Sequence, residues 1–420
     1  MDKFKINGPS KIRGEVSISG SKNAALPILA ASLLFDKNVT IKNLPRVKDI
    51  DTMLNLLKSL GRKISFKNNK KIATISKGKK NNFFAPYSLV KTMRAGILVL
   101  GPLLAKNKKA KVSSPGGCSI GVRPIDIHLK AISKLGVKIK IEKGYVNAKA
   151  KEGLVGSEIR FPKISVGATE NLILAACLAN GTTTIKNCAI EPEIKDLTNF
   201  LKTAGAKIKW IGKRTLKIEG VKTLKSITYS IMNDRIEAGT FCVAACLNSG
   251  NLKIKNFEPK IINTEINLLK KIGAKIKTTK NTIQIKGPKK IKSLNFLKTG
   301  EYPNFPTDLQ AQIMVLLTRA NGKSTIEENI FENRFMHVPE LKRLGAKINI
   351  KGNKAIIEGT NNLDGAELMS SDLRASVALV LAAFISRGTS IINRVYHLDR
   401  GYERIENKLK KIGVKIKRIS

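Results

Sequence analysis

The sequence predicts an α/β fold made from six copies of one unit. Three observations support this: a glycine recurs at a nearly constant interval, an Ala-rich apolar helix precedes it, and a short Lys/Ile strand follows it. A period of this length is the signature of a repeat architecture, and alternating helices and strands favour α/β layers. An open solenoid is also compatible with such an array. The closing glycines are Gly61, Gly136, Gly205, Gly273, Gly345 and Gly413, spaced by 68 to 75 residues.

The first helix of each unit is rich in Ala, Leu, Ile and Val on more than one face. A helix that is apolar nearly all round is predicted to be buried. The six predicted helices are Asn23–Leu34, Met93–Ala105, Glu170–Asn180, Arg235–Asn248, Leu309–Ala320 and Leu373–Ser386.

The second helix of each unit is more amphipathic, as in Asp49–Ser59 and Pro339–Leu344. The glycine after it fits a left-handed C-terminal cap. Lysines alternate with isoleucines in the strand that follows, so one strand face is expected to meet water. Buried helices, together with strands that expose one face to solvent, predict sheets that wrap around helices, the reverse of a TIM barrel. Three units per domain would give two similar halves.

The chain has 420 residues and 42% hydrophobic content, enough for two domains and possibly three. The longest apolar runs, such as Ala375–Phe384, are too short to span a membrane and indicate buried helices. The first seven residues contain no apolar signal core. We therefore expect a soluble, cytoplasmic protein with no membrane insertion.

The net charge of +46 would suit a nucleic-acid binder. The lysines, however, are spread along the whole chain, and aromatic residues make up only 5%, too few for a base-stacking surface. An AT-rich coding sequence explains the lysine content more simply. The five cysteines form no Cys-x-x-Cys pair and there are three histidines, which argues against a disulfide framework, a zinc ribbon or a Ser-His-Asp triad.

One loop, Pro115–His128, departs most from the repeat. It contains three glycines and two prolines around a single thiol, Cys118, with Arg123 shortly after. Glycines give backbone freedom and room for a ligand, while a nearby arginine favours a thiolate or holds an anion. An ordinary Gly/Pro turn with an incidental cysteine remains the alternative.

Cations also stand where irregular segments meet predicted helices. Together they predict a site for a small, multiply anionic substrate held by forked hydrogen bonds. Asp308 lies in the first turn of a predicted helix, where a helix-capping role is equally possible. The cations are Lys22, Arg94, Arg123, Arg334, Arg374 and Arg400, and Asp399–Glu403 is expected to open a helix.

Eight motifs in order make the chain resemble the UDP-N-acetylglucosamine enolpyruvyl transferase family over its full length. The Pro-Gly-Gly-Cys…Arg-Pro loop separates that family from the shikimate-pathway enolpyruvyl transferases, which share its fold. The motifs are Gly20–Pro27, Met93–Gly101, Pro115–His128, Ser165–Asn171, Phe305–Gln312, Phe331–Leu341, Asp372–Ser376 and Asp399–Ile405.

The resemblance implies two inside-out α/β barrel domains, each with pseudo-threefold symmetry. One domain would span residues 21–231, and the other would combine 1–20 with 232–420, with the active site in a cleft between them. The implied reaction transfers the enolpyruvyl group of phosphoenolpyruvate to the 3'-hydroxyl of UDP-N-acetylglucosamine and releases phosphate. It passes through a tetrahedral ketal and is the first committed step of peptidoglycan synthesis.

The resemblance also implies roles for individual residues. Cys118 would protonate the enol methylene and Asp308 would take the sugar hydroxyl proton. Lys22, Arg94, Arg123 and Arg400 would hold phosphoenolpyruvate, with Arg334, Asp372 and Arg374 around them. Lys22 and Arg400 would count with Cys118 and Asp308 as catalytic. The nucleotide sugar would contact Asn23, Arg123, Pro124, Ile125, Asp126, Ile127, Lys163, Ser165, Val166, Gly167, Asp308 and Ile330.

No metal or organic cofactor and no nucleic acid is required, and a monomer is favoured. A shikimate 3-phosphate transferase, or remotely a basic nucleic-acid-binding scaffold, remains the alternative. The chain departs from the family pattern at Ser21, Gly96 and Asn304, and none of these removes a charged group. Because the family members with aspartate in place of the cysteine resist fosfomycin, Cys118 predicts sensitivity to it.

Overall fold

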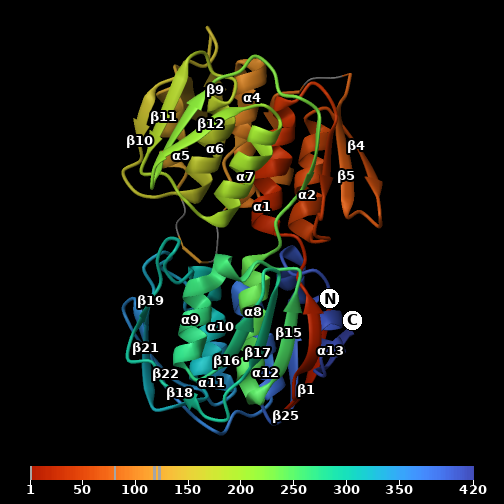
Figure 1. Cartoon of the computed structure of the whole chain (residues 1–420), viewed down its shortest axis with the longest axis vertical. Helices are drawn as coiled ribbons and strands as arrows, with labels where there is room; N and C mark the ends of the chain where they lie inside the picture. The colour runs from red at the N-terminus through yellow and green to blue at the C-terminus, as the bar shows by residue number, and fades with distance from the viewer. Residues whose placement is uncertain (1, 80–81, 117–119, 122–123) are drawn as a thin grey trace. The chain divides into compact units, whose positions relative to one another are not determined.

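The computed structural model describes residues 2–79, 82–116, 120–121 and 124–420. The chain forms two compact units (Figure 1). Unit 1 contains the residues up to Ser19 and those from Asn233 to Ser420, together with 120–121. Unit 2 contains the remaining described residues between Gly20 and Met232. The chain passes from one unit to the other beside Gly20 and beside Met232, and residues 120–121 are a further part of unit 1 within the sequence span of unit 2.

Each unit contains three four-stranded sheets with one shared topology. The first strand runs parallel to the second, and the third and fourth follow antiparallel. The parallel pair and the antiparallel pairs recur in all six sheets, although in one sheet the last antiparallel pair, β1 with β26, joins strands far apart in sequence instead of forming a hairpin. The repeated α/β architecture predicted from the glycine period is confirmed.

The sheets of unit 2 are mostly built from consecutive segments. The exception is the edge strand β14, which comes from the end of the unit and pairs with β3 near its beginning. In spatial order the sheets are β14 (Ile227–Ser230), β3 (Val39–Lys42), β5 (Ile72–Lys77) and β4 (Arg62–Lys67); β6 (Phe84–Ala85), β7 (Lys109–Ser113), β9 (Tyr145–Lys149) and β8 (Lys138–Glu142); and β10 (Glu158–Arg160), β11 (Thr182–Lys186), β13 (Thr215–Glu219) and β12 (Lys207–Gly212).

The N-terminal strands complete two sheets of unit 1. Strand β1 lies between β25 and β26, near the C-terminus, and β2 pairs with β15. The sheets are β2 (Arg13–Ser17), β15 (Asn251–Lys255), β17 (Thr282–Lys286) and β16 (Lys275–Thr278); β19 (Leu297–Lys298), β21 (Lys323–Glu327), β23 (Lys354–Glu358) and β22 (Lys347–Lys351); β24 (Glu367–Met369), β25 (Gly388–Asn393), β1 (Lys3–Gly8) and β26 (Lys415–Ile419); and a small pair, β18 (Ile291–Lys292) with β20 (Ala320–Asn321).

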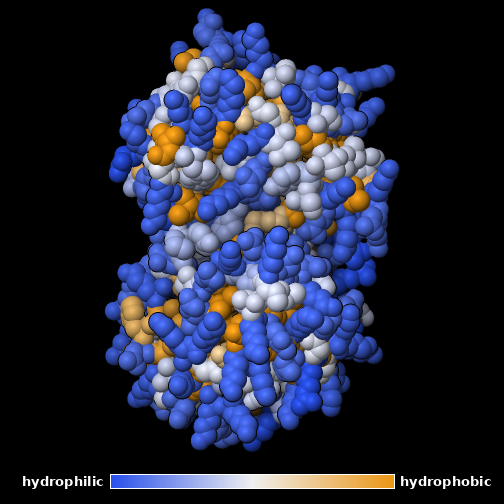
Figure 2. Space-filling model, viewed as in Figure 1, coloured by the Kyte–Doolittle hydropathy of each residue, from blue (hydrophilic) through white to orange (hydrophobic). Residues whose placement is uncertain are grey.

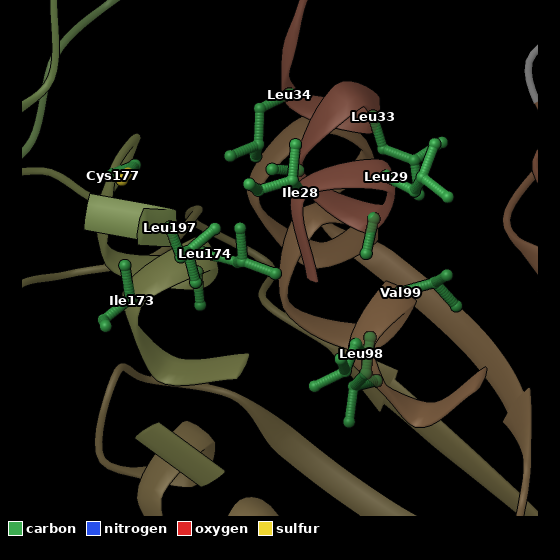
Figure 3. Packing of buried hydrophobic residues seen from close by; sticks show 14 of the residues in the cluster. Ile28, Leu29, Leu33, Leu34, Leu98, Val99, Ile173, Leu174, Cys177 and Leu197 are labelled. Atoms are coloured by element: carbon green, nitrogen blue, oxygen red, sulfur yellow. The ribbon is translucent and has the colours of Figure 1, made fainter. Parts of the chain in front are cut away.

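The first helix of every repeat is buried, as predicted. In unit 2 these helices pack against one another through Ile28, Leu98 and Leu174 (Figure 3). In unit 1, every residue of α12 from Arg374 to Ile385 is buried. Burying a Leu or Ile side chain contributes about 1.5–3 kcal/mol, so these central helices are the main source of stability in each unit.

The remaining helices and short 3-10 segments lie around the buried ones. In unit 2 the helical segments are α1 (Lys22–Ala31), η1 (Ser32–Leu34), α2 (Lys48–Ser59), α3 (Tyr87–Val90), η2 (Arg94–Val99), α4 (Leu100–Asn107), α5 (Asp126–Ser133), α6 (Val166–Ala176) and α7 (Pro192–Thr203). In unit 1 they are α8 (Arg235–Cys246), η3 (Leu247–Ser249), η4 (Pro259–Ile262), α9 (Asn263–Lys271), η5 (Thr307–Leu309), α10 (Gln310–Leu317), α11 (Val338–Arg343), α12 (Leu373–Ile385), η6 (Val395–Arg400) and α13 (Ile405–Lys411).

The strands are apolar on one face and lysine-bearing on the other. In β15, Leu252 and Ile254 are buried while Lys253 between them is exposed. This alternation follows from the two-residue period of a strand. The face of the molecule in Figure 2 is accordingly hydrophilic over most of its area. Within the described residues, no helix combines the length and apolar character that crossing a membrane requires.

Two sets of glycines are required by the repeat. The six closing glycines have φ between +83° and +111°, which confirms the predicted left-handed caps. A second set, which the sequence did not reveal, follows the third strand of several repeats. A Cβ on Gly220 would lie 1.7 Å from the carbonyl oxygen of Ala179, and one on Gly359 would lie 1.6 Å from that of Ala320. These positions let a strand end pass directly over the end of a buried helix.

The free cysteines of the described chain, Cys177, Cys188, Cys242 and Cys246, are all buried. Burial raises the pKa of the Cys177 thiol to about 12, so it stays protonated and unreactive. Several predicted helix boundaries were wrong, as in α6, which begins at Val166 rather than Glu170 and ends at Ala176 rather than Asn180. Asp399 and Arg400 end the short segment η6 rather than opening a helix, and α13 begins only at Ile405. Arg94 lies in the 3-10 segment η2, because the α-helical geometry starts at Leu100.

Glu170 on α6 provides a test of the packing in unit 2. Its burial, together with the nearby Glu193 and Glu191, raises its pKa well above the usual value. As the pH rises past about 4.3, the unfolded chain loses this proton while the folded chain keeps it, so folding stability decreases. We expect Glu170→Gln to stabilise unit 2 at pH 8, with a smaller gain near pH 5.

Urea unfolding followed by the fluorescence of Trp210, the one tryptophan in the sequence, measures this effect in unit 2. Glu152→Gln, on an exposed turn, is the matched control and should leave the unfolding midpoint unchanged at both pH values. The gain in stability from Glu170→Gln, relative to wild type, should be larger at pH 8 than at pH 5. An equal gain at both pH values would contradict the raised pKa of Glu170.

Candidate active site

Asp308 in unit 1 is held by two arginines from different segments. Its Oδ1 accepts a hydrogen bond from Nη2 of Arg334 at 2.8 Å, and its Oδ2 accepts one from Nη2 of Arg374 at 2.8 Å. Asp308 lies in η5, Arg334 precedes α11, and Arg374 is the second residue of α12. Both arginine side chains are almost completely buried, whereas 28% of the Asp308 side chain is exposed. Three predicted site residues therefore meet in one cluster that solvent reaches at the carboxylate.

Arg334 is fixed in a tight loop structure. Its Nε and Nη2 both donate to the carbonyl oxygen of Thr307, at 3.2 and 3.1 Å. The Thr307 hydroxyl donates to the buried carboxylate of Glu328, whose other oxygen accepts from the backbone N–H groups of Ile330 and Phe331. Glu328 thus links the Ile330 loop to the segment that carries Asp308. The predicted site residue Ile330 is held here by its backbone.

Arg374 is placed by the start of α12 and by an aromatic ring. Asp372 caps this helix, since its Oδ1 accepts from the backbone N–H groups of Arg374 and Ala375. The guanidinium carbon of Arg374 lies 5.6 Å from the centre of the Tyr402 ring. Asp372, predicted to surround the substrate, therefore has a clear structural role in this chain.

A buried polar network lies behind this pair. The hydroxyls of Tyr402 and Thr240 are 2.9 Å apart, and Nε2 of Gln312 donates to Thr240 Oγ1 at 3.3 Å and to the carbonyl oxygen of Asp308 at 3.0 Å. Thr240 and Gln312 come from α8 and α10. The three buried helices of unit 1 thus each contribute a polar side chain to the surroundings of Asp308.

The electrostatics of Asp308 differ from those of an ordinary surface carboxylate. Burial by itself would raise its pKa, but the charges of Arg374 and Arg334 more than offset this and hold the pKa well below its usual range. The Asp308 charge in turn raises the pKa of Arg374 despite its burial. Asp308 is therefore ionised. Neither η5 nor α10 has a side-chain cap hydrogen bond from the described residues, so the capping interpretation was wrong.

His337 is buried next to this cluster. Its Nδ1 lies 3.2 Å from the carbonyl oxygen of Arg334, which fits an Nδ1–H donor. Burial lowers the pKa of His337 to about 4, the nearby Asp372 opposes that change, and Arg334 adds to it. The ring is thus neutral at pH 7 and supports the backbone of Arg334.

In unit 2, Lys22 is the first residue of α1 and pairs with Asp49 on α2. The Lys22 ammonium lies 3.0 Å from Oδ2 of Asp49, and both side chains are largely buried. The hydroxyl of Ser21 caps α1 by accepting from the N–H of Ala24. Lys22 is thus a buried cation that already has a carboxylate partner, and Asn23 follows it on the half-buried first turn.

A second group of predicted residues in unit 2 surrounds His128. Nη2 of Arg94 donates to the carbonyl oxygen of Pro124 at 3.1 Å, which ties η2 to the segment that enters α5. Nδ2 of Asn171 lies 3.3 Å from Nδ1 of His128. Burial, followed by the charge of Arg94, lowers the pKa of His128 to about 3, so the ring is neutral. This neutral ring is part of the support beneath the segment 124–127.

Gly167 packs against the same histidine. A Cβ at this position would lie 3.0 Å from Cε1 of His128. The hydroxyl of Ser165 caps α6 by accepting from the N–H of Ala168. Segment 124–127 and the start of α6, two of the stretches predicted to contact the nucleotide sugar, therefore share a common support. Lys163 and Val166 are exposed beside them, and Asp126 and Pro124 are exposed on α5 and before it.

Cys118 and Arg123 lie outside the described residues, so their predicted roles remain predictions. Next to them, a Cβ on Gly116 would lie 2.6 Å from the carbonyl oxygen of Lys91, so close packing requires this glycine. Beyond Cys118, the backbone N–H of Asn333 donates to the carbonyl oxygen of Ile120 at 3.1 Å. Arg400 is half-buried at the end of η6.

Several residues of these clusters had no predicted role. Four of them are acidic or hydroxyl-bearing residues that interact with a predicted site residue or with its neighbour: Asp49, Glu328, Thr240 and Tyr402. Gln312 stood inside a recognised motif but was not assigned. A polar residue inside an otherwise apolar helix, as with Thr240 and Gln312, is a signal that could have found them. In the described part of the chain, no group of three or more Cys, His, Asp or Glu residues is arranged to hold a metal ion.

The arrangement is suited to binding anions and accepting a proton. It offers buried cations next to a carboxylate, and it lacks the histidine or cysteine clusters of a metal centre in the described residues. Comparison with known proteins agrees with this chemistry. Residues 6–409 match the family model of EPSP synthase (3-phosphoshikimate 1-carboxyvinyltransferase). The chain belongs to this family of enolpyruvyl transferases.

Relatives within the enolpyruvyl transferases match the chain from end to end. UDP-N-acetylglucosamine 1-carboxyvinyltransferase of Pelagibacter ubique (strain HTCC1062) is 65% identical over 420 residues, with all of both chains covered. The enzymes of the same name from Ruthia magnifica and Psychrobacter sp. (strain PRwf-1) are 51% and 48% identical, with the whole of this chain and 100% and 97% of theirs covered.

Solved structures of enolpyruvyl transferases share the fold. The enolpyruvyl transferase NikO from Streptomyces tendae superimposes with a TM-score of 0.87 at 22% identity, over 99% of this chain and 98% of its own. EPSP synthase from Acinetobacter baumannii gives a TM-score of 0.78 at 18% identity over all of both chains. At these identities the similarity establishes the fold.

Proposed function

We propose that this enolpyruvyl transferase moves the enolpyruvyl group of phosphoenolpyruvate to the 3'-hydroxyl of UDP-N-acetylglucosamine and releases phosphate. The reaction is the first committed step of peptidoglycan synthesis. The observation that carries the proposal is the 65% identity, over every residue, to an enzyme named for this transfer. The Pro-Gly-Gly-Cys…Arg-Pro segment, which resembles the corresponding loop of that family, supports the choice of acceptor.

The chemistry proceeds by addition and then elimination. C3 of phosphoenolpyruvate takes a proton while the sugar oxygen bonds to C2, which gives a tetrahedral ketal. Loss of a methyl proton and of phosphate then restores the double bond on the product. The residues proposed for the two proton transfers are Cys118, as donor to carbon, and Asp308, as acceptor of the hydroxyl proton. The ionised state of Asp308 supports an acceptor role, because a carboxyl group can take up a proton only in its ionised form.

Cations are proposed to bind the phosphate and carboxylate groups of the substrate. The largely buried Lys22 ammonium and the Arg374 guanidinium are already desolvated, so their attraction for an anion is stronger than in water. Lys22 and Arg400 are proposed to act in catalysis together with Cys118 and Asp308. Arg94, Arg123, Arg334, Asp372 and Arg374 complete the proposed phosphoenolpyruvate contacts, and the nucleotide sugar is proposed to lie along Asn23, residues 123–127, Lys163, residues 165–167, Asp308 and Ile330.

We also propose that each unit is an inside-out α/β barrel with pseudo-threefold symmetry. Three sheets of one topology per unit, with buried first helices, support this arrangement. Residues 21–231 and the combination of 1–20 with 232–420 are the proposed domains. Both are proposed to contribute residues to the same reaction. A monomer in the cytoplasm is the proposed state.

The shikimate 3-phosphate reaction is the second candidate, because the matching family model and a structure of the same fold carry that name. Phosphate release from phosphoenolpyruvate, measured with each acceptor in turn, separates the two. The proposal predicts turnover with UDP-N-acetylglucosamine and none with shikimate 3-phosphate. Turnover with shikimate 3-phosphate alone would replace it with the second candidate.

The proposed role of Cys118 predicts alkylation by the epoxide fosfomycin. A thiolate opens an epoxide to give a stable thioether, so the intact protein should gain the mass of one inhibitor molecule, located on the Cys118 peptide. Cys118→Ser should remain unmodified, and the buried Cys177 should not react in either protein. Mass spectrometry of the peptides measures both outcomes, and an unmodified Cys118 in active enzyme would exclude the role.

A further inference from the structure

Asp196 on α7 is a buried carboxylate of unit 2 that has no part in the proposed reaction so far. The residue is 8% exposed. Its Oδ1 accepts a hydrogen bond from the Tyr229 hydroxyl at 2.7 Å, and its Oδ2 accepts one from the backbone N–H of Met232 at 3.2 Å. Burying a carboxylate is unfavourable unless its oxygens are hydrogen-bonded, so Asp196 and these two donors hold one another in place.

Asp196 is largely ionised at pH 7. Burial raises its pKa to about 6, the hydrogen bonds from Tyr229 and Met232 oppose that change, and the charge of Glu193 on the same helix adds to it. Burial, together with the charge of Asp196, raises the pKa of Tyr229, so the Tyr229 hydroxyl stays protonated and donates. Asp196 therefore accepts from both donors at neutral pH.

Met232 connects this carboxylate to the start of α1. The carbonyl oxygen of Met232 accepts a hydrogen bond from the backbone N–H of Ser21 at 2.8 Å. Ser21 caps α1 with its hydroxyl, and its carbonyl oxygen accepts from the N–H of Ala25. Lys22 follows as the first residue of the helix. Two hydrogen bonds, one on each side of Met232, thus lead from Asp196 to the cap of α1.

The residue before Met232 is supported from another element. The backbone N–H of Ile231 donates to the carbonyl oxygen of Lys42 at 3.1 Å, and its carbonyl oxygen accepts from Nδ2 of Asn43 at 2.9 Å. These bonds tie residue 231 to the end of β3. Helix α7 also packs against α1, but apolar contacts are non-directional. The hydrogen bonds through Met232 are therefore the directional link from α7 to the cap of α1.

We propose that Asp196 is a positioning residue for Lys22. It holds Met232, which in turn holds Ser21 and so places the first turn of α1. A displacement of this turn by about 1 Å would move the Lys22 ammonium relative to a bound anion, which is enough to lower a rate by about 10²-fold. This inference rests on the proposed function for the role of Lys22, whereas the hydrogen-bonded link depends only on the geometry of unit 2.

Three substitutions separate positioning from a general contribution to packing. Asp196→Ala removes the acceptor of both donors, and Asp196→Leu replaces it if the alanine variant does not fold. Asp196→Asn is the conservative variant, because its amide oxygen can accept from Met232 while its NH₂ group donates to the Tyr229 hydroxyl. That hydroxyl can then donate to the backbone carbonyl oxygen of residue 196, which lies 3.2 Å away. Tyr229→Phe is the matched control, since it removes one hydrogen bond of Asp196 and keeps the one to Met232.

Amide hydrogen exchange at pH 7 reports the link without any substrate. NMR of protein labelled with ¹⁵N-methionine and ¹⁵N-serine measures it, with the signals assigned by Met232→Leu and Ser21→Ala. In Asp196→Ala, exchange at Met232 and Ser21 should be about 3–10-fold faster, the effect of one lost hydrogen bond. Met53, inside α2, is the reference amide and should be unchanged. Asp196→Asn and Tyr229→Phe should keep wild-type rates at both positions.

The steady-state kinetics of the same proteins report the consequence for Lys22. Asp196→Ala should lower kcat/KM for phosphoenolpyruvate by about tenfold or more, because the cation is misplaced. Asp196→Asn should restore it, and Tyr229→Phe should retain it. A purely structural role would lower the unfolding midpoint of Asp196→Ala and of Tyr229→Phe without this difference in kcat/KM.

Wild-type exchange at Ser21 in Asp196→Ala, or an equal acceleration at Met53 in that protein, would overturn the inference. A Tyr229→Phe protein that loses as much kcat/KM as Asp196→Ala would also overturn it. The proposed function is tested separately by phosphate release with UDP-N-acetylglucosamine. Wild-type turnover with unchanged exchange in Asp196→Ala would retain the proposed function and remove the positioning role. The expected exchange pattern in a chain without turnover would do the reverse for the link and the function.

Discussion

Asp308→Asn is expected to lower the turnover number for phosphate release by about 10²–10⁴-fold, the usual contribution of a positioned general base. The substitution keeps the size of the side chain and one acceptor oxygen, so one arginine retains its hydrogen bond. The other arginine then faces an amide and loses a charged partner. The loss of the base should appear mainly in kcat, because Lys22 pairs with Asp49 and its anion contacts do not depend on Asp308.

The exposed pair Asp364–Arg387 provides a matched control. Arg387 donates two hydrogen bonds to Asp364, at 2.8 and 3.2 Å, on the surface of the same unit. Asp364→Asn should leave kcat unchanged and cost at most about 1 kcal/mol of stability, as for other exposed pairs. Asp308→Asn with wild-type kcat and an intact near-UV circular dichroism spectrum would exclude Asp308 as the base.

The Asp308 substitution should also affect the stability of unit 1, and the depressed pKa of Asp308 gives the direction of the change. The folded pKa of Asp308 is depressed below the unfolded value of about 3.9, so the ionised group stabilises unit 1 at pH values above it. That contribution disappears as the pH falls through the folded pKa. Kinetics of the variant are therefore best measured near pH 7 at a temperature where the spectrum confirms folding.

Gly220→Ala is expected to lower the stability of unit 2 by more than about 3 kcal/mol. The added Cβ would lie 1.7 Å from the carbonyl oxygen of Ala179 and 2.8 Å from its carbonyl carbon, so the backbone itself must move. The strand β13 and the end of α6 would separate, which opens the core of unit 2. Urea unfolding followed by Trp210 fluorescence measures the change.

Gly212→Ala is the control for this substitution, since it adds the same methyl group in the same sheet. A Cβ there meets only the side chain of Thr215, at 3.5 Å, which is ordinary contact. The control should change stability by less than about 1 kcal/mol. Equal midpoints for the two variants would show that the close approach at Gly220 does not matter for folding.

Much of the fold could be predicted because the parts of the repeat depend on local features of the sequence. The closing glycines, the buried first helices and the lysine-bearing strand faces each follow from a turn, a periodicity or an apolar face. The pairing of the sheets could not be predicted in the same way. Strand β14 pairs with β3, from which most of the unit 2 sequence separates it, and β1 pairs with β25, from which most of the chain separates it. No local pattern determines such long-range neighbours.

The candidate site was predicted in part. The cations were found because they stand on irregular segments at helix entrances, and the family resemblance supplied their roles. Their partners were not found, because pairs such as Lys22–Asp49 and Asp308–Arg374 join residues that are distant in sequence. The boundary error at Asp399 has a similar cause: η6 ends where Tyr402 turns into the core, a tertiary contact that outweighs local helix signals.

In the proposed reaction, the chain joins phosphoenolpyruvate to UDP-N-acetylglucosamine by addition and elimination. Mass spectrometry of the products formed in deuterium oxide tests it most directly. We expect UDP-N-acetylglucosamine carrying one enolpyruvyl group, one phosphate released per product, and deuterium in the enolpyruvyl methylene because C3 is protonated from solvent before elimination. A product without deuterium would contradict the mechanism, and phosphoenolpyruvate that reacts only when shikimate 3-phosphate is supplied would contradict the proposed reaction itself.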